Sequence, residues 1–177
     1  MRINVHAGHN PAGMTACGAV GLINESTENR KVKNEVIRLL KMRNDTVYDC
    51  TVDNGRNQTD VLRKIVEKCN AHEVDLDISI HFNSAANDSN GDGKTTGTEV
   101  YVYSAASSAA PFAARVCREI DSLGFKNRGV KYNRGLYVLK NTKAPAMLIE
   151  CCFVDDRDDV KLYSYEKMAA AIVRAIT

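Results

Sequence analysis

The chain has 177 residues, of which 44% are hydrophobic and 26% are charged, and its formal net charge is +2. These values are typical of one globular domain. The longest apolar runs are too short to cross a bilayer, so membrane insertion is not expected. No basic block is present, and nucleic acid is therefore not an expected partner.

The start of the chain and its cysteines indicate the compartment of synthesis. His6, Asn10 and several glycines interrupt any apolar stretch of the kind that forms a signal peptide. We therefore expect synthesis in the cytoplasm, with a mature chain that starts near Met1. The 6 cysteines are scattered and form no CxxC pair. This pattern argues against a structural zinc ribbon or a disulfide framework and favours reduced, mostly buried thiols.

Apolar periodicity predicts strands and helices in alternation. The first half is expected to form a strand at 2–6, a helix at 26–43, a strand at 47–52, a helix at 59–71 with Thr59 as N-cap, and a strand at 76–82. A polar loop at 83–97 follows. The second half is expected to form a strand at 99–103, a helix at 108–123, strands at 136–139 and 146–151, and a helix at 164–176. This order predicts an α/β fold, a largely parallel twisted sheet of about six strands flanked by helices on both faces.

Polar side chains that carry chemistry stand at the ends of the predicted strands. His9 follows the first strand, His81 lies near the end of the third, and Glu150 lies near the end of the last. Glu25 stands just before the first long helix. Function collects at the carboxyl ends of strands in such sheets, so these groups are expected at one edge. Histidine with carboxylate is a zinc ligand set, and a further carboxylate nearby is a candidate general base.

Ordered motifs along nearly the whole chain resemble one enzyme family. They are "VHAGH", "NESTEN", "LRKIVEKCN", "DLDISIHFNS", "GTEVYVY", "NRGVK" and "LYVLKNTKAPAMLIECCF". In this order they resemble the zinc-dependent N-acetylmuramoyl-L-alanine amidases of bacterial autolysins and phage endolysins. Any one of these motifs alone is not specific, but the ordered set is.

The resemblance implies an activity and a role for each candidate residue. It implies one zinc ion per chain, held by His9, Glu25 and His81, with Glu150 as the catalytic carboxylate. The reaction implied is hydrolysis of the amide that joins the lactyl group of muramic acid to L-alanine in peptidoglycan. Glu150 would take a proton from water and pass it to the departing alanine nitrogen. Asn83, on the same polar strand face as His81, is expected to contact substrate.

The resemblance also implies a setting. Peptidoglycan is the expected partner and the bacterial cell wall the place of action. Enzymes of this family commonly carry a separate wall-binding module, for which this chain has no room, so residues 1–177 are expected to form a single catalytic domain. The missing signal peptide suits an endolysin released by a membrane-permeabilising partner of the holin type.

Some assignments leave alternatives open. Glu28 is close to Glu25, and either could cap the helix at 26–43; Glu25 is favoured because it keeps a four-residue step to Asn29. His6 stands where many relatives carry the Asp of an Asp-Pro pair. It is left out of the zinc ligands, because on a strand it and His9 would point to opposite faces.

Other patterns compete with the zinc hydrolase. Cys151 and Cys152 follow Glu150, so a Cys-His protease that uses His81 is a weaker alternative. Residues 88–99 match the calcium-loop pattern D-x-N-x-D-G-x5-E, but strands flank them where an EF-hand needs helices. Two further function classes remain, another zinc peptidase that acts on cell-wall peptides and a non-catalytic wall-binding module.

Overall fold

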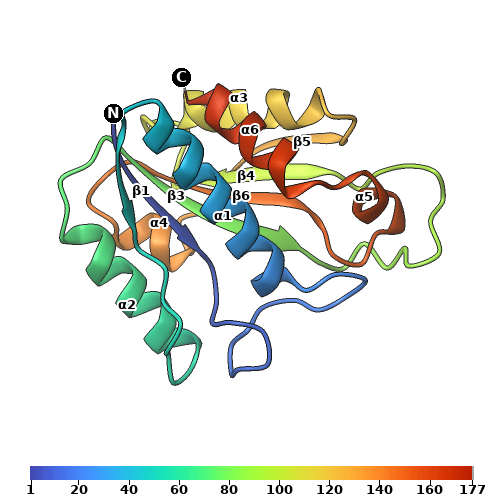
Figure 1. Ribbon diagram of the computed structural model, residues 1–177, viewed down its shortest axis with the longest axis horizontal. Coiled ribbons are helices and arrows are strands. Elements are labelled where there is room, and N and C mark those ends of the chain that lie inside the picture. Colours follow the sequence, from blue (N-terminus) through green and yellow to red (C-terminus); the bar gives the residue numbers. More distant parts are fainter. Residues whose placement is uncertain (177) are drawn as a thin grey trace.

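The computed structural model describes residues 1–176, and its centre is a mixed sheet of 6 strands in the order β2-β1-β3-β6-β4-β5 (Figure 1). Strands β2, β1, β3 and β6 are parallel. Strand β4 runs antiparallel to β6, and β5 runs parallel to β4. The strands span Arg2–Ala7 (β1), Thr46–Asp49 (β2), Leu76–Asn83 (β3), Thr98–Val102 (β4), Asn127–Tyr132 (β5) and Ala146–Phe153 (β6).

Helices cover both faces of the sheet, which confirms the predicted α/β architecture. The helices span Glu25–Met42 (α1), Gln58–Asn70 (α2), Ala110–Asp121 (α3), Tyr137–Asn141 (α4), Arg157–Leu162 (α5) and Tyr165–Ala175 (α6). Helices α1, α3 and α6 pack on one face and share the main hydrophobic core with the strands. Helices α2 and α4 build a second, smaller cluster on the other face around Ile65 and Val138 (Figure 1).

Side-chain N-caps explain where helices α1 and α2 begin. The Asn24 side chain accepts a hydrogen bond from the Thr27 amide and starts α1, and Glu25 and Glu28 lie in the first turn, where acidic groups favour the helix dipole. Helix α2 begins one residue earlier than predicted, because Asn57 and not Thr59 is its N-cap. Within residues 1–176, no helix combines the length and the apolar character needed to span a membrane.

One predicted strand is wrong, and two elements were not predicted. Residues 136–139 were expected to be a strand, but Tyr137–Asn141 form the short helix α4, which turns Val138 and Leu139 inward. Strand β5 lies at the sheet edge and has the glycine-containing, charged sequence "NRGVKY", so it lacks the apolar alternation of a buried strand. Helix α5 has only 6 residues and follows its cap, Asp156.

The cysteine prediction is confirmed within the described residues. All 6 cysteines are free, and every one except Cys17 is buried. Cys151 and Cys152 are fully buried, and burial raises the pKa of both thiols well above the usual value. A buried thiol of raised pKa is a poor nucleophile, so the structure gives no support to the Cys-His protease alternative.

Candidate active site

The ends of β1, β3 and β6 bring the predicted site residues together. His81 on β3 is the register partner of Glu150 on β6. His9 lies just past β1, and Glu25 is the first residue of α1. The ligand atoms of His9, Glu25 and His81 all lie within 4.8 Å of one another. These three groups and Glu150 line one open cleft.

Glu25 is the centre of this cluster. Its Oε1 lies 3.0 Å from Nδ1 of His81 and 3.3 Å from Nε2 of His9. Its Oε2 accepts a hydrogen bond from the Ala19 amide at 2.8 Å. Burial raises the pKa of Glu25, but hydrogen bonds and charge from His81 and His9 outweigh burial and hold that pKa well below its usual range. Glu28 instead accepts hydrogen bonds from Lys31 and Tyr163, outside the cluster.

Two glycines make room for the cluster. A Cβ on Gly8 would lie 2.0 Å from Cε1 of His81, so only glycine lets the end of β1 pass this ring. A Cβ on Gly18 would lie 2.5 Å from Oε2 of Glu25, and Gly18 also has a φ of +77°. Steric crowding by the His81 ring therefore explains why a glycine, Gly8, precedes His9 in the sequence.

Helix α1 fixes the backbone that presents His9. Asn29 donates a side-chain hydrogen bond to the Gly8 carbonyl at 3.0 Å, and Arg30 donates to the His9 carbonyl at 2.9 Å. His9 itself has a φ of 63°, in the left-handed region that few non-glycine residues adopt. The four-residue step from Glu25 to Asn29 thus joins a cluster residue to a residue that holds the loop beside it. Arg30 was not identified from the sequence.

Glu150 has a different environment from Glu25. Its Oε2 is buried and has no hydrogen-bond partner among the described residues. Burial, followed by the negative charges of Glu25 and Glu99, raises the pKa of Glu150 to about 8. A carboxyl group with a buried, unpaired oxygen and a raised pKa in a cleft has the properties of a proton-transfer group.

His6 lies outside the cluster, as predicted. Its side chain is fully buried, with Nδ1 3.4 Å from the Ser79 hydroxyl on the neighbouring strand. Burial lowers the pKa of His6 to about 3, so the ring is neutral at physiological pH. The reason expected from the sequence, that His6 and His9 point to opposite faces of one strand, does not apply, because β1 ends at Ala7 and His9 lies beyond it.

Asn83 lines the cleft and is tied to a network that the sequence did not reveal. Its amide donates to Oε1 of Glu99 at 3.0 Å. Glu99 is almost fully buried and also accepts hydrogen bonds from Tyr101 at 2.8 Å and Arg128 at 2.8 Å. The sequence motifs "GTEVYVY" and "NRGVK" contained Glu99 and Arg128, but nothing in them paired the two residues.

The calcium-loop pattern does not form an EF-hand. Glu99, its last position, faces the Arg128 side chain on the sheet instead of a loop. Asp88 lies near Asp156 and Asp158, with ligand atoms within 4.8 Å of one another. Oxygens of all three carboxylates accept backbone N–H groups of the surrounding loops, as in Gly91 to Asp88, Thr96 to Asp156 and Gly93 to Asp158.

Comparison with known proteins assigns the family. Residues 3–177 match the family model for N-acetylmuramoyl-L-alanine amidase. The chain belongs to this family. It is 37% identical over 164 residues to an uncharacterized protein of Clostridium perfringens, with 92% of this chain and 47% of that protein covered. It is 31% identical over 164 residues to the endolysin of Bacillus phage SPP1, with 88% of this chain and 56% of the endolysin covered. The chain thus spans about half the length of these relatives.

Solved structures of amidases share the fold. The catalytic domain of the CD27L endolysin targeting Clostridia difficile superposes with a TM-score of 0.86 and 27% identity, over 99% of this chain and 96% of that chain. The amidase AmiC2 of Nostoc punctiforme gives a TM-score of 0.81 and 27% identity, over 99% and 94% of the two chains.

Proposed function

We propose that this chain is the catalytic domain of a zinc-dependent N-acetylmuramoyl-L-alanine amidase, which hydrolyses the amide between the lactyl group of muramic acid and L-alanine in peptidoglycan. One observation carries the proposal. The cluster of His9, Glu25 and His81 faces the same cleft as Glu150, whose buried Oε2 has no partner. Family membership supports the amide as the bond cleaved, and the cell wall as the place of action.

The three clustered residues fit one zinc ion. Two imidazoles and one carboxylate are a set of protein ligands that catalytic zinc takes in hydrolases, and such sites keep a position open for water or substrate. Ionised Glu25 supplies the negative charge that a cation needs, and the cluster opens to the cleft. Bound zinc supplies a Lewis acid that polarises the scissile carbonyl and makes water more acidic.

Glu150 handles the protons in this proposal. Its Oε2 accepts a proton from the attacking water, and the resulting carboxylic acid donates that proton to the alanine nitrogen as the C–N bond breaks. An amide anion is a very poor leaving group, so the second transfer is as necessary as the first. The pKa of Glu150 falls when a cation occupies the cluster beside it, because positive charge favours the carboxylate. This shift favours the ionised carboxylate, which is the form that acts as the base.

Asn83 is proposed to contact substrate. It lines the cleft beside His81, and its side-chain amide is held by Glu99. This hydrogen bond fixes the orientation of the Asn83 side chain before substrate arrives, which lowers the entropy lost on binding.

Product chemistry tests the reaction. Purified peptidoglycan should yield new amino-terminal L-alanine, an intact glycan and falling turbidity. Chelation should stop the release, and zinc should restore it. Release of another amino-terminal residue would indicate a zinc peptidase, and wall binding without any new amino group would indicate a non-catalytic binding module. Full activity of protein shown by elemental analysis to contain no transition metal would remove zinc from the proposal.

A further inference from the structure

The sheet face that carries Glu150 continues beyond the cleft. Pairing of β6 with β4 places Glu99 beside Glu150 and Tyr101 beside Leu148. Pairing of β4 with β5 places Lys131 beside Tyr101. Partners in register project to the same face of a sheet. A single face therefore runs from Glu150 across β4 to Lys131.

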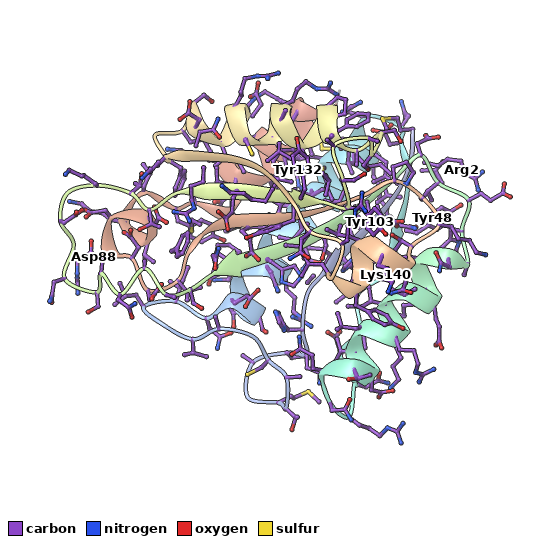
Figure 2. The ribbon with its side chains drawn as sticks, turned by 180° about the vertical axis from the view of Figure 1, so that it is seen from behind. Arg2, Tyr48, Asp88, Tyr103, Tyr132 and Lys140 are labelled. Carbon is purple, nitrogen blue, oxygen red and sulfur yellow. The ribbon has the colours of Figure 1, made fainter. Side chains whose placement is uncertain are left out.

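Much of this face is left uncovered by helices. Helices α3 and α6 pack against the opposite face, through residues such as Val100. On the Glu150 face, α4 packs near the start of β6, where Leu139, Ala146 and Leu148 form a small cluster against which Tyr101 and Leu136 pack. Seen from behind, α2 and α4 lie to one side, and no helix crosses in front of the middle of β4 and β6 (Figure 2). Tyr101 and Lys131 are accordingly half-buried.

A bulge in β5 places two cations on this face. Arg128 and Lys131 are three positions apart, so in a regular strand they would point to opposite faces. The register shifts between Thr98 and Val100, so that three steps along β5 match two along β4, and Gly129 has a φ of +80°. Both side chains therefore lie on the face of Glu99 and Tyr101. Bulges often re-aim side chains beside active sites.

The two cations differ in their partners. Arg128 is paired, since its Nε donates to Oε2 of Glu99 at 2.8 Å. The Lys131 side chain has no hydrogen bond or ion pair in residues 1–176, although its backbone belongs to the ladder between β4 and β5. Burial raises the pKa of Glu99, but Arg128, Tyr101 and the charge of Lys131 outweigh it and hold that pKa below its usual range. Lys131 is thus a positive charge on the open face with no partner of its own.

We propose that Lys131 binds a carboxylate of the substrate's peptide, and that the peptide side of the scissile amide lies along the open face. The inference rests on the proposed function. Charge complementarity gives the direction, because wall peptides carry carboxylates, whereas the N-acetylated sugars next to the scissile amide carry none. Lys131 lies two strands away from Glu150 in the sheet, and two residues further along the strand direction. Standard strand dimensions therefore place the Cα of Lys131 roughly 12 Å from the Cα of Glu150. An extended peptide covers about 3.3–3.6 Å per residue, so the carboxylate belongs to a residue about two to four positions from the cleaved bond.

Matched soluble substrates test the inference. Two synthetic muramoyl tetrapeptides are compared, one with free peptide carboxylates and one with those groups converted to amides. The wild-type domain should cleave the free form with a kcat/KM about 2- to 5-fold higher at low salt, as expected for one partly solvated charge pair. The difference should narrow in high salt. Lys131→Gln should abolish the preference through KM, with kcat for the amidated substrate unchanged, and Lys131→Arg should retain it.

A charge-matched control separates local from general effects. Lys41→Gln removes the same charge from an exposed position of α1, a helix on the other face of the sheet, and should leave the preference intact. Equal cleavage of both substrates by the wild type, or an unchanged preference in Lys131→Gln, would overturn the inference and leave the proposed amidase activity standing. Failure of the wild type to release L-alanine from either substrate would remove the proposed function and the inference together.

Discussion

Two carboxylates in one cleft are held in opposite electrostatic states. Glu25 receives hydrogen bonds from His9 and His81 and is kept ionised. Glu150 is desolvated, lies near other negative charge, and has its pKa raised to about 8. Groups whose environments push their pKa values apart in this way commonly divide acid–base work from ligand work. The difference between ligand and proton carrier can therefore be tested one residue at a time.

Glu150→Gln should separate metal binding from chemistry. Glutamine keeps the shape of the side chain but cannot accept the water proton, and loss of a general base typically costs about 10²–10⁴ in rate. We expect the upper end, because the same group also serves the leaving nitrogen. Zinc content by elemental analysis should stay near that of the wild type. The free energy of unfolding should hold or rise, since the substitution removes the cost of burying a carboxyl group whose pKa is raised to about 8.

His81→Ala is the matched contrast, because it should lose both zinc and activity. If Glu150→Gln instead emptied the site of zinc, Glu150 would be a ligand and the role of Glu25 would need revision. Hydrolysis of wall by Glu150→Gln at the normal rate would rule out the proton-transfer role.

Gly8→Ala should disturb the site without touching any ligand. The new Cβ would lie 2.0 Å from the His81 ring, so the ring or the end of β1 must move. Overpacking of this kind typically costs about 1–3 kcal/mol. We expect a lower denaturation midpoint and weaker zinc binding by calorimetry. Gly93→Ala is the control: its φ is +83° and nothing lies within 4 Å of its Cβ, so it should cost some strain and no zinc affinity. Equal zinc affinity in both variants would refute the steric role of Gly8.

At the level of elements, strong apolar periodicity predicted most of the fold. Helices α1, α2, α3 and α6 and strands β1, β3, β4 and β6 appear close to their expected positions, because each presents a buried apolar face. The errors fall where this signal is weak. The run "LYVL" has strand-forming residues but packs as one helical turn, and the edge strand β5 owes its place to pairing with β4, which no local pattern encodes.

The candidate site was predictable for a related reason. Parallel strands place their carboxyl ends at one edge, so His9, His81 and Glu150 could be grouped from strand positions alone. The choice of Glu25 over Glu28 needed the resemblance to a family. The partners of Glu99 and Arg128 depend on a bulge and on two strands distant in sequence, which short-range spacing cannot encode.

Away from the cleft, a buried hydrogen-bond network joins β1, β3 and α2 through Asn4, Asp77 and Cys69. Asn4 donates to Oδ1 of Asp77 at 2.6 Å and to the Cys69 carbonyl at 3.0 Å. Burial raises the pKa of Asp77 to about 6, against opposing hydrogen bonds from Asn4 and Cys69. Its Oδ2 and the Asn4 Oδ1 are buried without partners among the described residues. The folded chain thus binds this proton more tightly than the unfolded chain does.

Stability from Asp77 should therefore be fully present below about pH 4 and lost as pH rises toward about 6. Asp77→Asn supplies a permanent donor and should remove this dependence, raising the free energy of unfolding at pH 7 by about 1–3 kcal/mol. Urea unfolding of both proteins at pH 4 to 7 measures how the free energy of unfolding depends on pH. Asp159 has a pKa raised to about 6 as well, so the difference between variant and wild type isolates Asp77. As a control, Asp121→Asn changes an exposed residue at a helix end and should leave the plot of unfolding free energy against pH unchanged. If Asp77→Asn shifted that plot by the same amount at every pH, titration of Asp77 would not be the cause.

At the scale of the whole molecule, the cluster joins segments that are far apart in sequence. His9 follows the first strand, Glu25 opens α1, and His81 lies in the middle of the chain. The loop at residues 8–24 is tied to α1 by hydrogen bonds that Asn29 and Arg30 donate to the Gly8 and His9 carbonyls, and to the strands by bonds such as that from the Gly8 amide to the Ile80 carbonyl. A ligand that binds only the folded arrangement of three such segments stabilises the entire domain.

Zinc should accordingly raise the melting temperature. Free zinc at 100 times its Kd adds about 2.7 kcal/mol to the stability of the folded state, and 1 kcal/mol shifts Tm by about 2–4 °C in a domain of this size. The expected rise is therefore about 5–11 °C by calorimetry, reduced by whatever zinc the 6 thiols bind in the unfolded chain. His9→Ala keeps all the thiols and should lose the rise. Calcium should leave Tm unchanged, because the carboxylates of Asp88, Asp156 and Asp158 already accept backbone N–H groups. An equal zinc effect in wild type and His9→Ala would place the metal elsewhere, and a calcium effect abolished by Asp88→Ala would establish a cation site in the loop beside α5.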